Sequence, residues 1–232
     1  MEQLALLALI AHPGDELPVA GTLARHAAAG VRISLVCATR AGPAPGPAEH
    51  ALRCSAAHLG VAAAHLAPFR RGELLSRPAC EVVRALVHEI RRLRPQVVLT
   101  FGPDGINADP ELIAVGGLAT QAAGAAGDRI QFPLEADEEL HDPDRVYRFG
   151  LPTGLLRLAG LPGEATPDEA VPVREEVGQF LPAKLAAARC YGDALEEPLA
   201  ALLRLGEPER SHLLGTEFLN LALPQPATAD RA

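Results

Sequence analysis

The chain has 232 residues, of which 48% are hydrophobic but only 3% aromatic, and it has no tryptophan. Its core must therefore consist mainly of alanine, leucine and valine, and aromatic platforms on which bases stack are scarce. The formal net charge of −8 excludes a generally basic surface, so the composition predicts no nucleic-acid partner.

Buried strands and helices alternate along the first half of the chain. Continuous apolar runs predict strands buried on both faces of a parallel sheet, at residues 4–11, 31–38 and 96–101. Apolar periodicity and terminal glycine or proline residues predict helices at residues 17–29, 50–59 and 79–93, with a short strand at 64–66. This alternation predicts an α/β fold with a Rossmann-like, mostly parallel sheet and helices on both faces.

The second half of the chain carries weaker signals, because glycine, proline and acidic residues become frequent between residues 124 and 178. We expect a strand at residues 146–149 and helices at residues 183–188 and 197–205. We expect a single domain over residues 1–232, with a Rossmann-like core in 1–120, a C-terminal extension of the same domain in 121–222, and a flexible tail in 223–232.

The N-terminal segment and the cysteines bear on location. The apolar run at residues 4–11 is too short for a membrane span, and no basic segment of a signal peptide precedes it. The four cysteines are far apart and form no CxxC pair, so we expect neither a disulfide framework nor a cysteine zinc site. These features predict a protein of the cytoplasm without a membrane partner.

Polar residues follow the first predicted strand, where open α/β sheets bind their ligands. The stretch LIAHPGDE, residues 9–16, places His12, Asp15 and Glu16 there, and a second polar segment at 102–111 follows the strand at 96–101. Both segments should meet at one crevice. An imidazole and a carboxylate at this spacing can reach one zinc ion. The alternative is that Asp15 caps the next helix while His12 bonds a local backbone group.

The stretch LIAHPGDE resembles the AHPDDE signature of the PIG-L/LmbE-like N-acetylglucosaminyl deacetylases. The similarity covers nearly the whole chain and continues in the segments GTL (21–23), LGV (59–61), IRRLRPQVVLTFGPDG (90–105), VYRFGLPTGLL (146–156) and TEFLNL (216–221). The resemblance implies a Rossmann-like deacetylase fold, zinc as cofactor, and hydrolysis of an acetamido group on a sugar conjugate.

The first motif of this family is only partly kept. By the resemblance, His12 and Asp15 correspond to two zinc ligands. Gly14 stands at the usual general-base position and has no side chain, which removes a contribution of roughly 10²–10⁴ to the rate. Glu16 corresponds to a residue that supports the loop.

The second family motif, HPDH, aligns with residues 109–112 of this chain. Leu112 replaces the third zinc ligand, and Asp109 replaces a histidine that stabilises negative charge in the transition state. Two further family positions, an aspartate before a glycine and a later histidine, are occupied by Arg71 and Tyr191.

These replacements predict a catalytically impaired or inactive family member that keeps a crevice for a ligand or partner and binds zinc weakly or not at all. The alternative is a zinc-dependent N-deacetylase with a rearranged site. In that case Asp109 or Glu111 supplies the missing ligand, and Asp109 and Glu16 are the candidate catalytic residues. A sugar-conjugate small molecule is the expected partner, and a homo-oligomer is an open possibility. A dinucleotide-binding protein is disfavoured, because GxGxxG is absent after the first strand.

Overall fold

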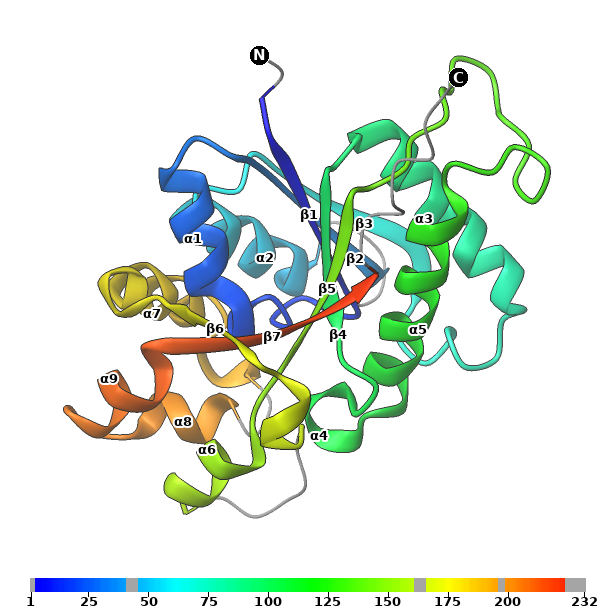
Figure 1. The fold of residues 1–232 in the computed structure, drawn as a ribbon. Coiled ribbons are helices and arrows are strands. Elements are labelled where there is room, and N and C mark those ends of the chain that lie inside the picture. Colours follow the sequence, from blue (N-terminus) through cyan, green and yellow to red (C-terminus); the bar gives the residue numbers. More distant parts are fainter. Residues whose placement is uncertain (1–2, 41–45, 161–165, 196–198, 224–232) are drawn as a thin grey trace.

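The computed structural model describes residues 3–40, 46–160, 166–195 and 199–223 (Figure 1). A seven-stranded sheet with the order β3-β2-β1-β4-β5-β7-β6 forms its centre. Neighbouring strands from β3 to β5 are parallel, whereas β7 is antiparallel to both β5 and β6. The strands are β1 (Ala5–Ile10), β2 (Arg32–Arg40), β3 (Ala63–Arg70), β4 (Val97–Phe101), β5 (Arg145–Gly150), β6 (Val173–Glu176) and β7 (Thr216–Leu223). The predicted Rossmann-like, mostly parallel sheet is confirmed.

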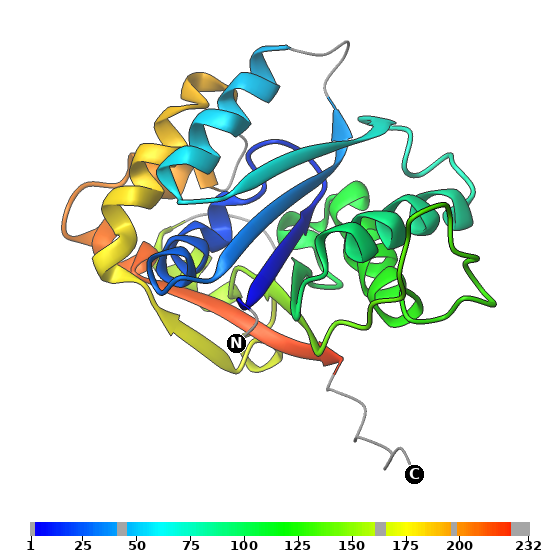
Figure 2. The ribbon, with the colours of Figure 1, turned by 90° about the horizontal axis from the view of Figure 1, so that it is seen from above.

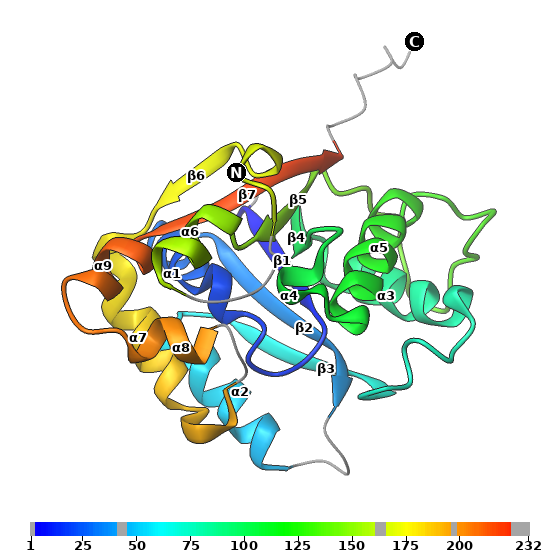
Figure 3. The same cartoon turned by 90° about the horizontal axis from the view of Figure 1, so that it is seen from below.

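Helices cover both faces of the sheet (Figure 2). On one side α3 packs against α5, and on the other side α7 packs against α1 and α2. The helices of the described residues are α1 (Ala20–Ala28), α2 (Pro47–His58), α3 (Ala79–Leu93), α4 (Gly105–Ala108), α5 (Pro110–Ala125), α6 (Thr153–Leu158), α7 (Leu181–Arg189), α8 (Leu199–Arg204) and α9 (Glu209–Leu214). The view from below shows α4 and α6 near the carboxyl ends of the parallel strands (Figure 3).

The pattern of apolar residues explains the elements that the sequence predicts well. All six residues of β1 are buried, as expected for a strand covered on both faces. Helix α3 has the predicted bounds, and its buried side chains Val83, Val87 and Ile90 repeat at helical spacing. The helix expected at 197–205 corresponds to α8, with its first residues outside the described part of the chain.

Helix α5 is not predicted from the sequence, because its residues PELIAVGGLATQAAGA have no clear polar face. Its small residues let it approach the sheet closely. A Cβ at Gly116 would lie 2.6 Å from the backbone oxygen of Phe101, so only glycine allows this contact with β4. The close packing of α5 on β4 fixes the position of the second polar segment, which lies at the start of α5.

The C-terminal part of the chain completes the same sheet. Strand β5 pairs with β4, and β7 is inserted between β5 and β6. The division at residue 120 stays a prediction, and the expected tail lies outside the described residues from 224 onward. None of the helices in the described ranges is long and apolar enough to cross a membrane.

The expectation of unpaired cysteines is wrong for one pair. Cys54 on α2 and Cys190 after α7 form a disulfide, with their Cα atoms 5.8 Å apart. The two residues are separated by 136 positions in the sequence, and only the packing of α2 on α7 brings them together. Spacing along the chain therefore carries no signal for this bond. Of the remaining cysteines, Cys37 is a buried free thiol and Cys80 an exposed one.

Candidate active site

A cavity of about 520 Å³ lies where the two polar segments meet, as the sequence predicts. Its volume falls within the range of about 300–1,000 Å³ that is usual for small-molecule sites. The charged side chains and the imidazole that line it come from the ends of β1 and β3 and from the start of α5, and they are His12, Asp15, Arg71 and Asp109.

The tautomer of His12 is set by its neighbour Thr39 on β2. The imidazole is buried, and its Nδ1 lies 2.7 Å from Thr39 Oγ1. The Thr39 hydroxyl has one proton, which it donates to the carbonyl oxygen of Ala11 over 2.9 Å. Thr39 Oγ1 must therefore accept a hydrogen bond from His12 Nδ1–H. In the neutral imidazole the lone pair then lies on Nε2, as in many metal-binding histidines.

Glu111 lies opposite that nitrogen. It belongs to the first turn of α5 and is buried, and its Oε2 is 3.4 Å from His12 Nε2. Both carboxylate oxygens also accept the N–H of Gly72, each at 2.9 Å, so Glu111 is held in place by the turn after β3. Two acceptor atoms at this distance repel each other unless a proton or a cation lies between them. Two ligands of a tetrahedral zinc ion lie about 3.4 Å apart, because each bond is about 2.0–2.2 Å long.

Asp15 closes the turn that follows β1. Its Oδ2 accepts the backbone N–H of His12 at 2.7 Å, and its own N–H donates to the His12 carbonyl oxygen at 3.2 Å. The carboxylate does not cap α1, whose N-terminus has no side-chain cap. The capping alternative considered from the sequence is therefore wrong, and Asp15 lies on the cavity wall beside His12.

Gly14 has a backbone conformation that favours glycine. Its φ of +108° lies where side-chain-bearing residues are rarely found. Among the described residues a Cβ would meet only the ring of Tyr191, at 3.8 Å, so conformation rather than space opposes a side chain here. The loss of the usual aspartate at this position is accompanied by a loop shape that an aspartate adopts with strain.

Glu16 anchors this loop to two helices. Its Oε2 accepts the N–H of Gly14 at 3.0 Å, while its Oε1 accepts the hydroxyls of Ser55 at 2.5 Å and Tyr191 at 2.7 Å. Burial raises the pKa of the Glu16 carboxyl, and burial together with Glu16 raises the pKa of the Tyr191 hydroxyl, which stays protonated. Glu16 is not among the residues that line the cavity, and its contacts fit the supporting role expected from the sequence.

Residues 109–112, which align with the second family motif, have different structural roles. Asp109 is the N-cap of α5, and its Oδ1 accepts the N–H groups of Glu111 at 2.7 Å and Leu112 at 3.3 Å. Leu112 lines the cavity, so hydrocarbon occupies the wall where the resemblance places a third ligand. The sequence patterns do not identify Thr39 and Gly72 as residues that hold His12 and Glu111. Thr39 alone has a usable signal, as a hydroxyl at the end of an otherwise apolar strand beside β1.

Comparison with known proteins places this geometry in a family. The family model described as GlcNAc-PI de-N-acetylase (PIG-L) matches residues 7–123, which is half of the chain. A 1D-myo-inositol 2-acetamido-2-deoxy-alpha-D-glucopyranoside deacetylase 2 from Catenulispora acidiphila is 32% identical over 187 residues. That alignment covers 63% of this chain but only 60% of the relative, so it spans less than two thirds of that protein.

Solved structures share the fold over almost the whole chain. The conserved protein TT1542 from Thermus thermophilus superposes with a TM-score of 0.74 and 26% identity, over 99% of this chain and 100% of that one. The N,N'-diacetylchitobiose deacetylase from Pyrococcus horikoshii superposes with a TM-score of 0.69 and 17% identity, over 94% of this chain and 83% of that one. With the family model matching from β1 through most of α5, the chain belongs to the PIG-L family.

Proposed function

We propose that the chain is a metal-dependent N-deacetylase that hydrolyses an acetamido group on an N-acetylglucosaminyl-type conjugate through a rearranged site. The observation that carries the proposal is the 3.4 Å separation of His12 Nε2 and Glu111 Oε2, two buried acceptor atoms that face each other. This function takes precedence over the inactive protein expected from the sequence, because relatives of the chain are named as deacetylases.

The donor types fit zinc, and two of the donors already face each other. His12 and Glu111 offer an imidazole nitrogen and a carboxylate oxygen 3.4 Å apart. Asp15 lines the same cavity beside His12, but its oxygens do not lie within 4.8 Å of both of these atoms, so its side chain must turn to complete a set of three protein ligands. Glu111 thereby takes the place of the histidine that Leu112 replaces. When bound, zinc supplies a Lewis acid that polarises the amide carbonyl and lowers the pKa of a water molecule. Thr39 and Gly72 hold the two ligands that they contact in the required orientation.

The charged groups of the cavity exchange their places relative to the family pattern. The family aspartate before a glycine is Arg71 here, and the family histidine is Asp109, so these two positions hold one cation and one anion. In this proposal Asp109 accepts a proton from the attacking water and passes it to the leaving amine. The Arg71 guanidinium stabilises the negative charge that develops on the carbonyl oxygen.

The walls of the cavity suit a sugar conjugate better than a charged polymer. Most of the remaining lining groups are uncharged, among them Pro18, Pro47, Leu151, Leu195 and Leu199. A cavity of about 520 Å³ accommodates one acetamido sugar with part of its aglycone. The products are acetate and the free amine. The cytoplasmic location expected from the sequence is part of the same proposal.

A non-catalytic ligand-binding member of the family is the second candidate. Two replacements favour it, the missing side chain at Gly14 and the leucine at 112. In that case His12 and Glu111 form an imidazolium–carboxylate ion pair, and the cavity binds its ligand without turnover.

Replacing Asp109 by asparagine tests the proposed chemistry. Asparagine keeps an oxygen that caps α5, so the fold is retained while the base is lost. We expect kcat for deacetylation of an N-acetylglucosaminyl conjugate by the zinc-loaded protein to fall by about 10²–10⁴. The control is Glu81→Gln, an exposed first-turn glutamate of α3, with unchanged kcat. Unchanged kcat in Asp109→Asn contradicts the role of Asp109, and a wild-type protein that binds the conjugate without releasing acetate supports the second candidate.

A further inference from the structure

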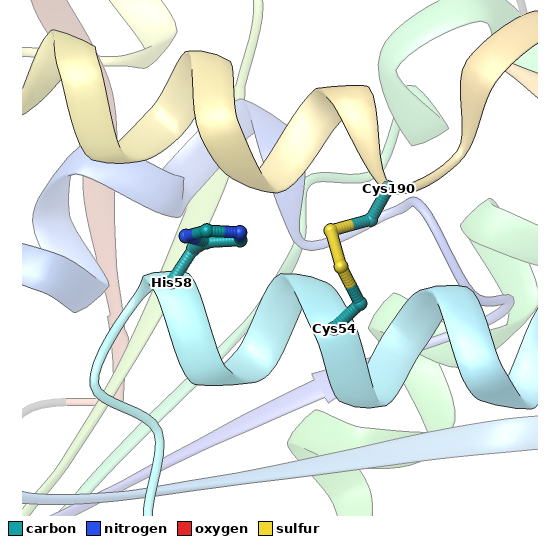
Figure 4. A group of neighbouring side chains, drawn as sticks. All are labelled: Cys54, His58 and Cys190. Atoms are coloured by element: carbon teal, nitrogen blue, oxygen red, sulfur yellow. A yellow bond between two sulfur atoms is a disulfide. The ribbon is translucent and has the colours of Figure 1, made fainter.

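Three metal-ligating side chains gather at the contact between α2 and α7 (Figure 4), and one of them, Cys190, also lines the cavity. Cys54 and His58 lie one turn apart on α2, and Cys190 follows the end of α7. One ligand atom from each residue lies within 4.8 Å of the other two. Cys54 and His58 are exposed and Cys190 is half-buried, so the group is accessible from solvent.

We propose that the reduced form of the chain binds one thiophilic divalent metal ion, such as zinc, through the thiolates of Cys54 and Cys190 and the imidazole of His58. The disulfide seen in the structure is then the metal-free, oxidised state of the same site. This site is separate from the one formed by His12 and Glu111, and the proposal does not depend on the deacetylase function.

The backbone geometry suits such a site. Two sulfur ligands of a tetrahedral zinc ion lie about 3.8 Å apart, because each Zn–S bond is about 2.3 Å long. The Cα atoms of Cys54 and Cys190 are 5.8 Å apart, so side-chain rotation can bring the sulfurs to this separation without moving the helices. Residues four apart on a helix face the same side, and His58 is therefore placed to supply a third ligand. Two thiolates and an imidazole, with water in the fourth position, form a known type of zinc site.

The conversion between the two states balances with an external thiol reductant. Two reductant thiols give up two electrons and two protons and become one disulfide, while Cys54 and Cys190 become free thiols by exchange. Metal binding then displaces the two thiol protons. The reducing cytoplasm that we propose for the protein supplies such thiols, and there the metal replaces the disulfide as the link between α2 and α7.

This link bears on the active-site loop through adjacent residues. Ser55 follows Cys54 and Tyr191 follows Cys190, and both donate hydrogen bonds to Glu16 Oε1. Holding the two cysteines together keeps both hydroxyls on Glu16, which in turn binds Gly14. A cross-link between α2 and α7 therefore stabilises the loop at Gly14 in both states, as a disulfide when the chain is oxidised and as a bound metal when it is reduced.

Cobalt(II) titration tests the proposal, since cobalt replaces zinc and shows sulfur-to-cobalt charge-transfer absorption only with thiolate ligands. The titration uses the variant Cys80→Ser, because this substitution removes the exposed free thiol. We expect one cobalt ion with a charge-transfer band in the reduced protein, and no such band in the oxidised protein. The carboxylates and imidazole around His12 give no such band, so the two sites are distinguished.

Variants define the three ligands. Cys54→Ser and Cys190→Ser should each abolish the two-thiolate spectrum. His58→Ala should lower cobalt affinity by about 100-fold or more, because loss of an outer partner of a ligand already costs about 10–100-fold. His50→Ala removes an exposed histidine one turn before Cys54, which is outside the group of ligand atoms within 4.8 Å of one another and should therefore have no effect. A reduced protein without the charge-transfer band, a band that survives Cys54→Ser, or equal affinities of His58→Ala and His50→Ala would each overturn the proposal.

Discussion

His12 and its contacts show how one hydrogen bond decides what a site can do. Thr39 accepts from Nδ1 because its own proton is used by Ala11, and this leaves Nε2 facing Glu111. Sequence patterns identify His12, Asp15 and Glu111 as candidates and bring their segments to one crevice, but they do not decide whether Asp109 or Glu111 faces His12. That contact depends on the position of α5 on the sheet, which no local pattern encodes.

Glu16 provides a prediction about pH. Burial raises its pKa above the ordinary value of 4.5, so its titration stabilises the fold below about pH 4.5, and this stabilisation is lost as the pH rises through the raised pKa. Glu16→Gln does not titrate. We therefore expect the free energy of unfolding of the wild type, relative to Glu16→Gln, to be largest near pH 4 and to decrease toward pH 8.

Urea denaturation of both proteins at several pH values measures this difference. Glu16→Gln also removes the carboxylate oxygen that accepts the N–H of Gly14. This loss lowers the free energy of unfolding by about 1–3 kcal/mol, independently of pH. A difference that stays constant or grows with pH would show that Glu16 is not held in a desolvated position.

Among the secondary-structure elements, prediction from the sequence succeeds where one physical signal dominates. Helix α3 is predicted at its observed bounds because its polar and apolar faces are distinct, and β1 because it is wholly apolar. Helix α5 is not predicted because small apolar residues lie on all sides of it and leave no polar face. It is stabilised by packing on β4 and α3. Strand β6 escapes it because its sequence VREE has exposed charges at an edge of the sheet.

The buried ion pair between α7 and β7 gives a prediction for element packing. Lys184 Nζ lies 2.6 Å from Glu217 Oε1, and Glu217 also accepts the N–H groups of Gly21 and Thr22 at the start of α1. Lys184→Met leaves the Glu217 carboxylate buried without its cation. We expect a loss of about 3–5 kcal/mol in the free energy of unfolding, measured by urea denaturation.

The exposed ion pair between Arg25 and Glu175 serves as the comparison. Arg25→Met should cost at most about 1 kcal/mol, since water screens an exposed pair. If Lys184→Met and Arg25→Met destabilise the protein equally, the three-way junction of α1, α7 and β7 does not depend on the buried pair.

In the molecule as a whole, distant segments meet at one end of a parallel sheet, and this much follows from the sequence. The rule that ligands bind at the carboxyl ends of parallel strands is enough to bring residues 12–16 and 109–112 together. Contacts between helices on the same face of the sheet cannot be predicted from the sequence in this way, because they depend on the order of the strands. The Cys54–Cys190 bond belongs to this second group.

The disulfide should stabilise the whole chain, because it joins residues 136 positions apart. A cross-link that closes so long a loop restricts the unfolded state and typically contributes about 2–4 kcal/mol. We expect the double variant Cys54→Ser, Cys190→Ser to lose about this amount relative to the oxidised wild type. Under reducing conditions with a chelator the two proteins should be equally stable, and equal stability in the oxidised state would contradict the prediction.

Zinc titration by calorimetry measures whether His12 and Glu111 hold a metal ion between them. The disulfide is kept intact, so that Cys54 and Cys190 cannot bind the metal. We predict one zinc ion for the wild type and for Glu81→Gln, and an affinity at least about 10–100-fold lower for Glu111→Gln, which keeps an oxygen for Gly72 but loses the charged ligand. A wild-type protein that binds no zinc, or a Glu111→Gln variant that binds it as tightly as the wild type, would contradict the account.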